Sequence, residues 1–321
     1  MNDGSVNSKS RKQRQVPWYL KASMALVLCV HWLLISPASE TPYGPEAKHD
    51  TIRFGIIAFY NPRVMILKYQ PLMDALTERT DFRFELVLST TYRQAVEQFK
   101  TGAVDIAYLG PVTYLRAHHD FGAEPLVKLN TSGKGTFQSV IAVRDISSLQ
   151  TLGELKGKRF AFGSPLSTSS HLYPRQMLRD AGLTLHDLGS YEYYRHHDSA
   201  AHAVLTGRAE ACGVRDVLAE RYMPRGLRVI AVSEPIPNFP LAVHPEMPEE
   251  RAKALRRAFL SLDPENPADK RMMAAWDREL REGFAPVRHE EYAAVEHLMN
   301  SLFGADAFKG SLLPEDREGG S

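Results

Sequence analysis

The feature that most constrains the fold of this chain is an alternation of strand-like and helix-like segments that begins at residue 51. Apolar runs rich in β-branched residues, typical of buried strands, alternate with stretches that carry an apolar stripe at helical spacing. Because a strand–helix–strand succession folds mainly into a parallel sheet covered by helices, this pattern predicts an α/β unit. The expected strands are 51–58, 82–88 and 104–109, and the expected helices are 71–79, 92–100 and 111–118.

The alternation restarts at Ser139, which predicts a second α/β unit followed by a helical C-terminal part. Ligands of open α/β sheets bind at the carboxyl ends of the strands, so two such units in series predict a two-lobed protein with one cleft. Strands are expected over 139–143, 159–162, 191–194, 209–214 and 228–233, and helices over 149–155, 171–180, 202–206, 249–260, 270–282 and 290–302.

Residues 1–38 have the order of a secretory signal peptide: a basic leader, the apolar run 22–35, and the small residues Ser36-Pro37-Ala38. The apolar run is shorter than the roughly 20 residues that a membrane span needs, although an uncleaved anchor is an alternative. We therefore expect an exported, periplasmic protein that has a linker over 39–50 and a C-terminal tail over 306–321.

Charge and cysteine content exclude several classes of function. Five of the 39 basic residues but only one of the 38 acidic residues lie in 1–38, so residues 39–321 carry a net charge of −3. A mildly acidic chain lacks the excess of positive charge that attracts nucleic acid. Two cysteines, Cys29 and Cys212, are too few for a zinc cage, and Cys212 stands alone once a signal peptide is removed. We expect no metal and no cofactor, and we expect Cys212 to be a small buried residue.

A run of hydroxyl residues follows the expected strand 159–162 and opens the next helix. Ser167, Thr168, Ser169 and Ser170 offer hydroxyl donors, and the first helical turn offers backbone N–H groups without intrahelical partners. Together with the positive end of the helix dipole, these groups predict a site for a tetrahedral oxyanion. A single serine that merely caps the helix is the structural alternative, but four adjacent hydroxyl residues exceed what one cap requires.

A second polar cluster, His196-His197-Asp198, follows the expected strand 191–194. Imidazole and carboxylate could accept a proton from a hydrogen-bearing oxyanion such as hydrogen phosphate or phosphite. A metal site is disfavoured, because adjacent histidines on a strand point to opposite faces. A solvated surface cluster is the remaining alternative.

A turn after the expected strand 104–109 is a third candidate. Gly110 in Tyr108-Leu109-Gly110-Pro111 permits close approach of the backbone to a ligand, although an ordinary strand–helix joint explains the segment equally well. The sequence lacks Gly-x-Ser-x-Gly, a Walker-type loop and His-Glu-x-x-His. We therefore do not expect an enzyme, and a phosphoesterase-like hydrolase that uses His197 is a remote alternative.

These segments, in this order, resemble the phosphate, phosphite and phosphonate family of ABC transporter periplasmic binding proteins. The resemblance covers nearly all of residues 51–300, and the Ser-Thr-Ser loop is its most specific part. It rests on Arg53-Phe-Gly-Ile, Pro71-Leu72, Tyr92, Val104-Asp-Ile-Ala-Tyr-Leu-Gly-Pro, Leu155-Lys-Gly-Lys-Arg-Phe-Ala-Phe-Gly, Ser167-Thr-Ser-Ser with Pro174 and Leu178, His197-Asp198, Ile236-Pro-Asn, Gly283-Phe284 and Tyr292.

The resemblance implies a type II periplasmic-binding fold with two chain crossings between lobes and a ligand cleft between them. It implies a first lobe over 51–135, to which 236–305 returns, and a second lobe over 136–235. It also implies a small oxyanion ligand, an ABC permease partner and a monomer. The ligand-binding residues that it implies are Ser167, Thr168, Ser169, Tyr92, Tyr108, Leu109, Gly110, His197, Asp198 and Asp216, and the hydroxyl run adds Ser170.

Four positions depart from the family pattern. Ser170 replaces a usual glycine, Leu109 stands where some relatives have an aromatic residue, Phe137 replaces a common tyrosine, and His196 doubles the histidine. These departures leave open which oxyanion is bound, and a thiol-reactive ligand at Cys212 is a further alternative. A sensory protein that reports to a membrane kinase is the main alternative to a transporter subunit.

Overall fold

The computed structural model describes residues 50–58, 60, 62–131 and 133–308, which fall within one compact unit, His49–Ser321. The predicted signal peptide 1–38 lies outside the described residues. So do the predicted linker, apart from Asp50, and the predicted tail beyond residue 308.

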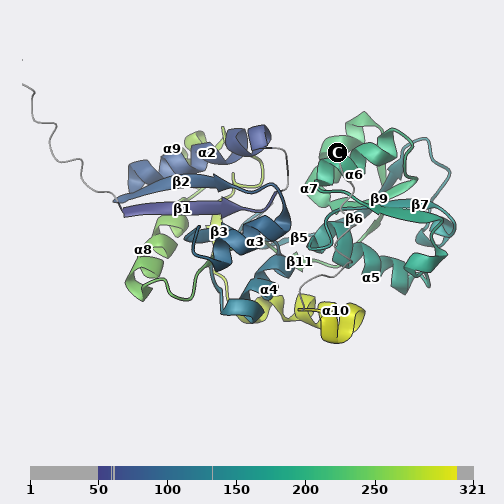
Figure 1. Cartoon of the computed structure of the whole chain (residues 1–321). Helices are drawn as coiled ribbons and strands as arrows, with labels where there is room; N and C mark the ends of the chain where they lie inside the picture. Colours follow the sequence, from purple (N-terminus) through teal and green to yellow (C-terminus); the bar gives the residue numbers. More distant parts are fainter. Residues whose placement is uncertain (1–49, 59, 61, 132, 309–321) are drawn as a thin grey trace, which may run out of the picture. The chain divides into compact units, whose positions relative to one another are not determined.

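A six-stranded sheet holds the first strands of the chain together with strands that return from its C-terminal part (Figure 1). The central pairs are parallel, as the strand–helix alternation predicts, and β12 runs antiparallel between β3 and β4. The order is β13-β4-β12-β3-β1-β2, with β1 (Asp50–Ile56), β2 (Phe82–Leu88), β3 (Ile106–Tyr108), β4 (Glu124–Leu129), β12 (Pro240–Val243) and β13 (Phe284–Ala285).

Helices pack on this sheet through apolar stripes. The first helix starts at Pro62, nine residues earlier than expected, and contains Pro71 in its interior. The expectation used Pro71 as a helix-start signal. Buried Met65, Tyr69, Leu72 and Leu76 show instead that one apolar stripe runs through the proline. The helices of this group are α2 (Pro62–Arg79), α3 (Tyr92–Lys100), α4 (Pro111–Phe121), α8 (Glu249–Leu260), α9 (Pro267–Met273) and α10 (Ala293–Phe303).

A five-stranded sheet contains the strands of the second alternation, which are confirmed to within two residues at each end. Its parallel pairs are β7 with β8 and β7 with β9, while β6 and β10 are antiparallel additions. The order is β10-β6-β9-β7-β8, with β6 (Ser139–Arg144), β7 (Arg159–Phe162), β8 (Ser190–Tyr193), β9 (Ala211–Arg215), β10 (Leu227–Val232) and the helices α5 (Tyr173–Asp180), α6 (His197–Leu205) and α7 (Asp216–Tyr222).

Two extended segments connect these sheets, and they pair with each other. Strand β5 (Thr136–Phe137) lies antiparallel to β11 (Ile236–Pro237) in a separate two-stranded ladder. Short 3₁₀ helices complete the connections, at Leu152–Leu155, Leu185–Asp187, Met223–Arg225, His289–Tyr292 and Gly304–Asp306.

The expected helix over 270–282 is wrong beyond Met273. Residues 274–283 form successive turns, which end at Gly283 with a φ of 70°. Tertiary contacts hold this segment: Asp277 pairs with Lys68 of α2, and Glu279 pairs with Arg215 of β9. The long-range ion pairs therefore override a local helical pattern.

Strand β9 lies close to the start of α5, and this contact requires a glycine. A Cβ atom at Gly213 would lie 2.4 Å from Cγ of Pro174. We expect Gly213→Ala to lower the free energy of unfolding by about 1–3 kcal/mol, because the crowded side chain must push the helix from the strand. Denaturant unfolding measures the loss. Gly153→Ala is the matched control, because no atom lies within 4 Å of its added Cβ, and equal losses for both variants would contradict the close packing.

Candidate functional site

The hydroxyl loop between β7 and α5 folds into one turn of π-helix, Thr168–Leu172, which continues into α5. Ser167 caps this turn, because its Oγ accepts a hydrogen bond from the backbone N–H of Ser170 at 3.1 Å. Ser170 in turn donates its hydroxyl to the carbonyl of Gly213 on β9. π-helical turns inside α-helices are frequent at functional sites. The helix start predicted from the sequence is confirmed, and it is anchored to the sheet.

Ser167 also belongs to a buried cluster with Tyr92 and His197. Nε2 of His197 lies 3.0 Å from Oγ of Ser167 and 3.1 Å from the hydroxyl of Tyr92. Tyr92 begins α3, beside the six-stranded sheet, whereas His197 begins α6, beside the five-stranded sheet. The cluster therefore joins residues from the two halves of the fold. All three side chains are less than 5% exposed.

The cluster is uncharged at neutral pH. Burial, reinforced by the charge of Arg215 and by His196, lowers the pKa of His197 to about 3. Burial raises the pKa of Tyr92 well above its ordinary value. Two hydroxyls and a neutral imidazole can donate or accept hydrogen bonds according to what binds beside them. Such a group suits recognition of an oxyanion through hydrogen bonds.

A positive charge lies close to this cluster. Arg215, at the end of β9, is 3% exposed and lies between the rings of Phe137 and Phe239, at 4.7 and 4.4 Å from their centroids. It donates to Oε2 of Glu279 at 2.9 Å and to Oδ1 of Asn238 at 3.1 Å. Burial lowers the pKa of Arg215, but Glu279, Tyr108, Asp216 and Tyr60 together outweigh burial, so the pKa lies above its ordinary value. Arg215 is therefore charged at any pH at which the protein folds.

Glu279 completes the polar centre. Its Oε2 atom accepts hydrogen bonds from Arg215 and, at 3.2 Å, from the hydroxyl of Tyr108 on β3. A small pocket, with room for about one water molecule, brings this ion pair together with His197. It is lined by Tyr60, His197, Arg215, Val217, Leu218 and Glu279.

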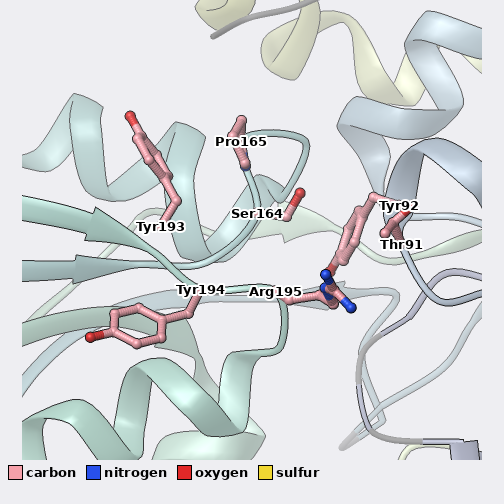
Figure 2. A pocket seen from close by; sticks show the side chains of 7 residues that line it. All are labelled: Thr91, Tyr92, Ser164, Pro165, Tyr193, Tyr194 and Arg195. Carbon is pink, nitrogen blue, oxygen red and sulfur yellow. The ribbon is translucent and has the colours of Figure 1, made fainter. Parts of the chain in front are cut away.

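A second pocket borders the cluster on the side of Tyr92 (Figure 2). In this view the side chains of Tyr92 and Arg195 point toward one another. Arg195 is exposed, so this edge of the cluster carries a cation that water can reach. The pocket is lined by Thr91, Tyr92, Ser164, Pro165, Tyr193, Tyr194 and Arg195.

Several residues of the predicted site lie around the cluster. Oγ1 of Thr168 accepts a hydrogen bond from the backbone N–H of Val112 at 3.0 Å, which links the hydroxyl loop to α4. Gly110 lies beside it, since an added Cβ would stand 3.6 Å from that Oγ1 atom. Oγ of Ser169 is buried and has no hydrogen-bond partner within the described part of the chain. Leu109 is buried in the core, where its backbone N–H donates to the carbonyl of Pro240.

The two predicted aspartates have partners of their own, although Oδ1 of Asp216 also lies 3.7 Å from Nε of Arg215. Asp198 lies in the first turn of α6 and accepts a hydrogen bond from the hydroxyl of Tyr222 at 3.1 Å. Asp216 begins α7, where its carboxylate accepts from the backbone N–H groups of Gln138 and Val217. Neither lines the pocket that holds the Arg215–Glu279 pair. Their contact with a ligand stays a prediction.

The two adjacent histidines lie at the start of a helix and not on a strand. Strand β8 ends at Tyr193, so His196 caps α6 and His197 opens it. Nδ1 of His196 lies 3.0 Å from the carbonyl of Ala58, away from the Nε2 contacts of His197. Among the described residues, no group of three His, Cys, Asp or Glu side chains could hold a metal ion.

Cys212 is fully buried on β9, as expected. Burial raises the pKa of its thiol to about 12. The thiolate that attacks or ligates is therefore scarce at neutral pH.

Arg215 and Glu279 are absent from the predicted site. Arg215 could have been found from the sequence, because it ends a strand directly before the predicted Asp216. Glu279 could not, because its segment was expected to be helical and only the tertiary fold brings it to β9.

Comparison with known proteins assigns the chain to a family. Residues 54–292 match a family described as the periplasmic substrate-binding protein of phosphonate ABC transporters. The phosphate-import protein PhnD of Mycolicibacterium smegmatis is 27% identical over 300 residues, covering 85% of this chain and 91% of that protein.

Two solved structures share the fold. One is PhnD1 of Prochlorococcus marinus in complex with methylphosphonate, with a TM-score of 0.72 and 20% identity over 79% of this chain and 99% of that one. The other is a binding protein component of an ABC phosphonate transporter from Pseudomonas aeruginosa, with a TM-score of 0.71 and 19% identity over 84% of this chain and 92% of that one. Within the described ranges, no helix is both long and apolar enough to span a membrane.

Proposed function

Because the chain belongs to the family of phosphonate ABC transporter periplasmic substrate-binding proteins, we propose that it captures a small phosphorus oxyanion at the cluster of Ser167, His197 and Tyr92. Its structural neighbours confirm the type II periplasmic-binding fold. As a member of this family the chain is a transport protein, and it binds its solute without chemical change. The observation that carries the proposal is the buried, uncharged cluster that joins both halves of the fold.

Hydrogen bonds would hold the oxyanion. One helical turn and its cap supply three hydroxyls, from Ser167, Thr168 and Ser169. The hydroxyl of Ser169 has no hydrogen-bond partner among the described residues. The backbone N–H groups of that turn add further donors. Arg215 supplies a positive charge close to His197 without depending on pH. Such a set favours a small tetrahedral anion over a neutral solute, because every buried donor left unpaired costs about 1–3 kcal/mol.

Closure of two lobes would complete the site. We propose the boundaries 51–135 and 236–305 for one lobe and 136–235 for the other, with the β5–β11 ladder at the hinge. Several hydrogen bonds already connect these lobes, among them Tyr92 to His197, Val112 to Thr168 and Arg215 to Glu279. Hinge closure around a ligand is a common transition of two-lobed binding proteins.

The ligand would be phosphate, phosphite or a phosphonate, and the partner would be the membrane permease of an ABC importer. The names of the relatives support this range: one imports phosphate, and another holds methylphosphonate. The family places the protein in the periplasm or outside the membrane. We propose that it acts as a monomer after cleavage near Ala38. A pull-down from membranes distinguishes a permease partner from a sensor kinase.

The hydroxyl loop gives the first test. We expect the double variant Ser167→Ala, Thr168→Ala to weaken binding of the preferred oxyanion by about 2–4 kcal/mol, or roughly 30-fold to 1,000-fold, because two donors are lost. Calorimetric titration with phosphate, phosphite, methylphosphonate and sulfate measures it. The double variant Thr101→Ala, Ser301→Ala is the control, because both side chains are exposed and neither lines the two pockets beside the cluster. Unchanged affinity would remove the loop from the binding site.

A further inference from the structure

The charged side chains around the two pockets balance one another, with one exception. In the pocket that holds the Arg215–Glu279 pair, the guanidinium lies 2.9 Å from Oε2 of Glu279 and 3.7 Å from Oδ1 of Asp216. Two carboxylates therefore face one guanidinium. His197 is neutral at pH 7, because burial lowers its pKa to about 3. The exception is Arg195 in the second pocket, which forms no ion pair within the described part of the chain.

Neighbouring groups do not supply a net positive charge. The guanidinium of Arg221 lies 5.3 Å from the ring centroid of Tyr60, which lines the first pocket. This arginine is also within electrostatic reach of Asp198 and Asp277. Residues 39–321 carry a net charge of −3, so the chain as a whole does not attract an anion. Capture of an oxyanion therefore needs a cation without a carboxylate partner at the site itself.

Arg195 has the position for this role. It lies between the end of β8 at Tyr193 and the start of α6 at His197, on one side of the cluster. Its side chain is exposed and points toward Tyr92, which belongs to the other half of the fold (Figure 2). The hydroxyl of Tyr92 lies 3.1 Å from Nε2 of His197, so the cation borders the cluster on the side that water reaches.

Resting on the proposed function, we propose that Arg195 is the charge determinant of the site: it captures the oxyanion at the mouth of the pocket. The hydroxyl loop and His197 then hold the oxygens of the anion by hydrogen bonds. A charge at the rim of a binding site acts mainly on the association rate and on its dependence on salt. Because Arg195 is exposed, salt screens its field over about 10 Å at 0.1 M.

Arg195→Gln tests this role, and the exposed position lets the variant fold. We expect the association rate constant for methylphosphonate to fall about tenfold in about 0.01 M salt, because the attraction between guanidinium and anion is lost. In about 0.5 M salt the difference between variant and wild type should shrink to about twofold or less. Stopped-flow intrinsic fluorescence measures the rates, and calorimetry measures the affinities.

Two matched variants separate charge at this position from other effects. Arg195→Lys keeps the charge, and we expect it to restore most of the rate. A loss that lysine does not restore would assign the effect to the planar guanidinium beside Tyr92 and would contradict the proposal. Arg271→Gln removes the same charge from α9, at an exposed arginine that lines neither pocket and has no ion pair among the described residues. An equal loss in Arg271→Gln would show that only the net charge of the chain matters.

The same measurements keep this inference apart from the proposed function. If the wild-type protein and Arg195→Gln bind methylphosphonate with the same rate and the same dependence on salt, the inference is wrong and the proposed function stands. If the wild-type protein binds none of phosphate, phosphite and methylphosphonate at any of these salt concentrations, the proposed function fails and the inference fails with it.

Discussion

The free energy of unfolding of the ligand-free protein is expected to fall by about 4 kcal/mol between pH 7.5 and pH 5, through two buried histidines. His171 and His197 are each at most 4% exposed. The pKa of each is lowered to about 3, mainly by burial, with Arg175 acting on His171 and Arg215 on His197. In the unfolded chain both return to an ordinary pKa of about 6.5.

The direction follows from which state binds the protons. Below pH 6.5 the unfolded chain takes up a proton at each histidine, whereas the folded protein stays neutral at both until about pH 3. Their contribution to stability is therefore complete above pH 6.5 and is lost as the pH falls toward 3. Each histidine accounts for about 2 kcal/mol at pH 5, at about 1.36 kcal/mol for each pH unit below the pKa of the unfolded chain.

Substitution isolates the effect of one histidine. His171 lies away from the proposed ligand, with Nδ1 at 2.8 Å from the carbonyl of Pro165 and Nε2 buried without a partner in the described part of the chain. We expect the stability gap between the wild-type protein and His171→Asn to narrow by about 2 kcal/mol from pH 7.5 to pH 5. Urea unfolding across this range measures the gap. His186→Asn, at an exposed histidine, should show no such change, and a constant gap for His171→Asn would show that His171 is protonated in the fold.

The sequence was informative where the local pattern and the fold agree. Ser167 and Thr168 follow a strand and open a helix, so their grouping can be predicted from neighbouring residues alone. His197 also follows a strand, and the carboxyl ends of neighbouring parallel strands meet at one edge of a sheet. The approach of Tyr92 to His197 is not local, and its prediction depended on the family resemblance.

Arg215 and Glu279, which the sequence prediction missed, show the limit of inference from local pattern. Glu279 lies 64 positions after Arg215 in the chain, and no local signal links them. The pattern over 270–282 favours a helix, but long-range pairs such as Lys68–Asp277 and Arg215–Glu279 hold the segment in turns. The family resemblance implies Asp216, and not Arg215, as the polar contact after this strand. In the structure Asp216 is used at the start of α7.

Loss of the Arg215 side chain is expected to destabilise the protein by about 3–5 kcal/mol, because it leaves the carboxylate of Glu279 buried without its counter-charge. Arg215→Met keeps an unbranched side chain between Phe137 and Phe239, so packing on the rings is largely retained. In this variant Oε2 of Glu279 still accepts a hydrogen bond from the hydroxyl of Tyr108, but a hydroxyl cannot replace the positive charge of Arg215. Denaturant unfolding at pH 7 gives the loss.

The double variant Arg215→Met, Glu279→Gln distinguishes the ion pair from packing. If the loss comes from the unpaired carboxylate, removing that charge as well should restore most of the stability, since a neutral replacement of a buried pair is often close to neutral in energy. If the double variant is as unstable as the single one, the loss comes from the contacts of Arg215 with Asn238 and the rings. A loss below about 1 kcal/mol in Arg215→Met would mean that Glu279 gains access to water.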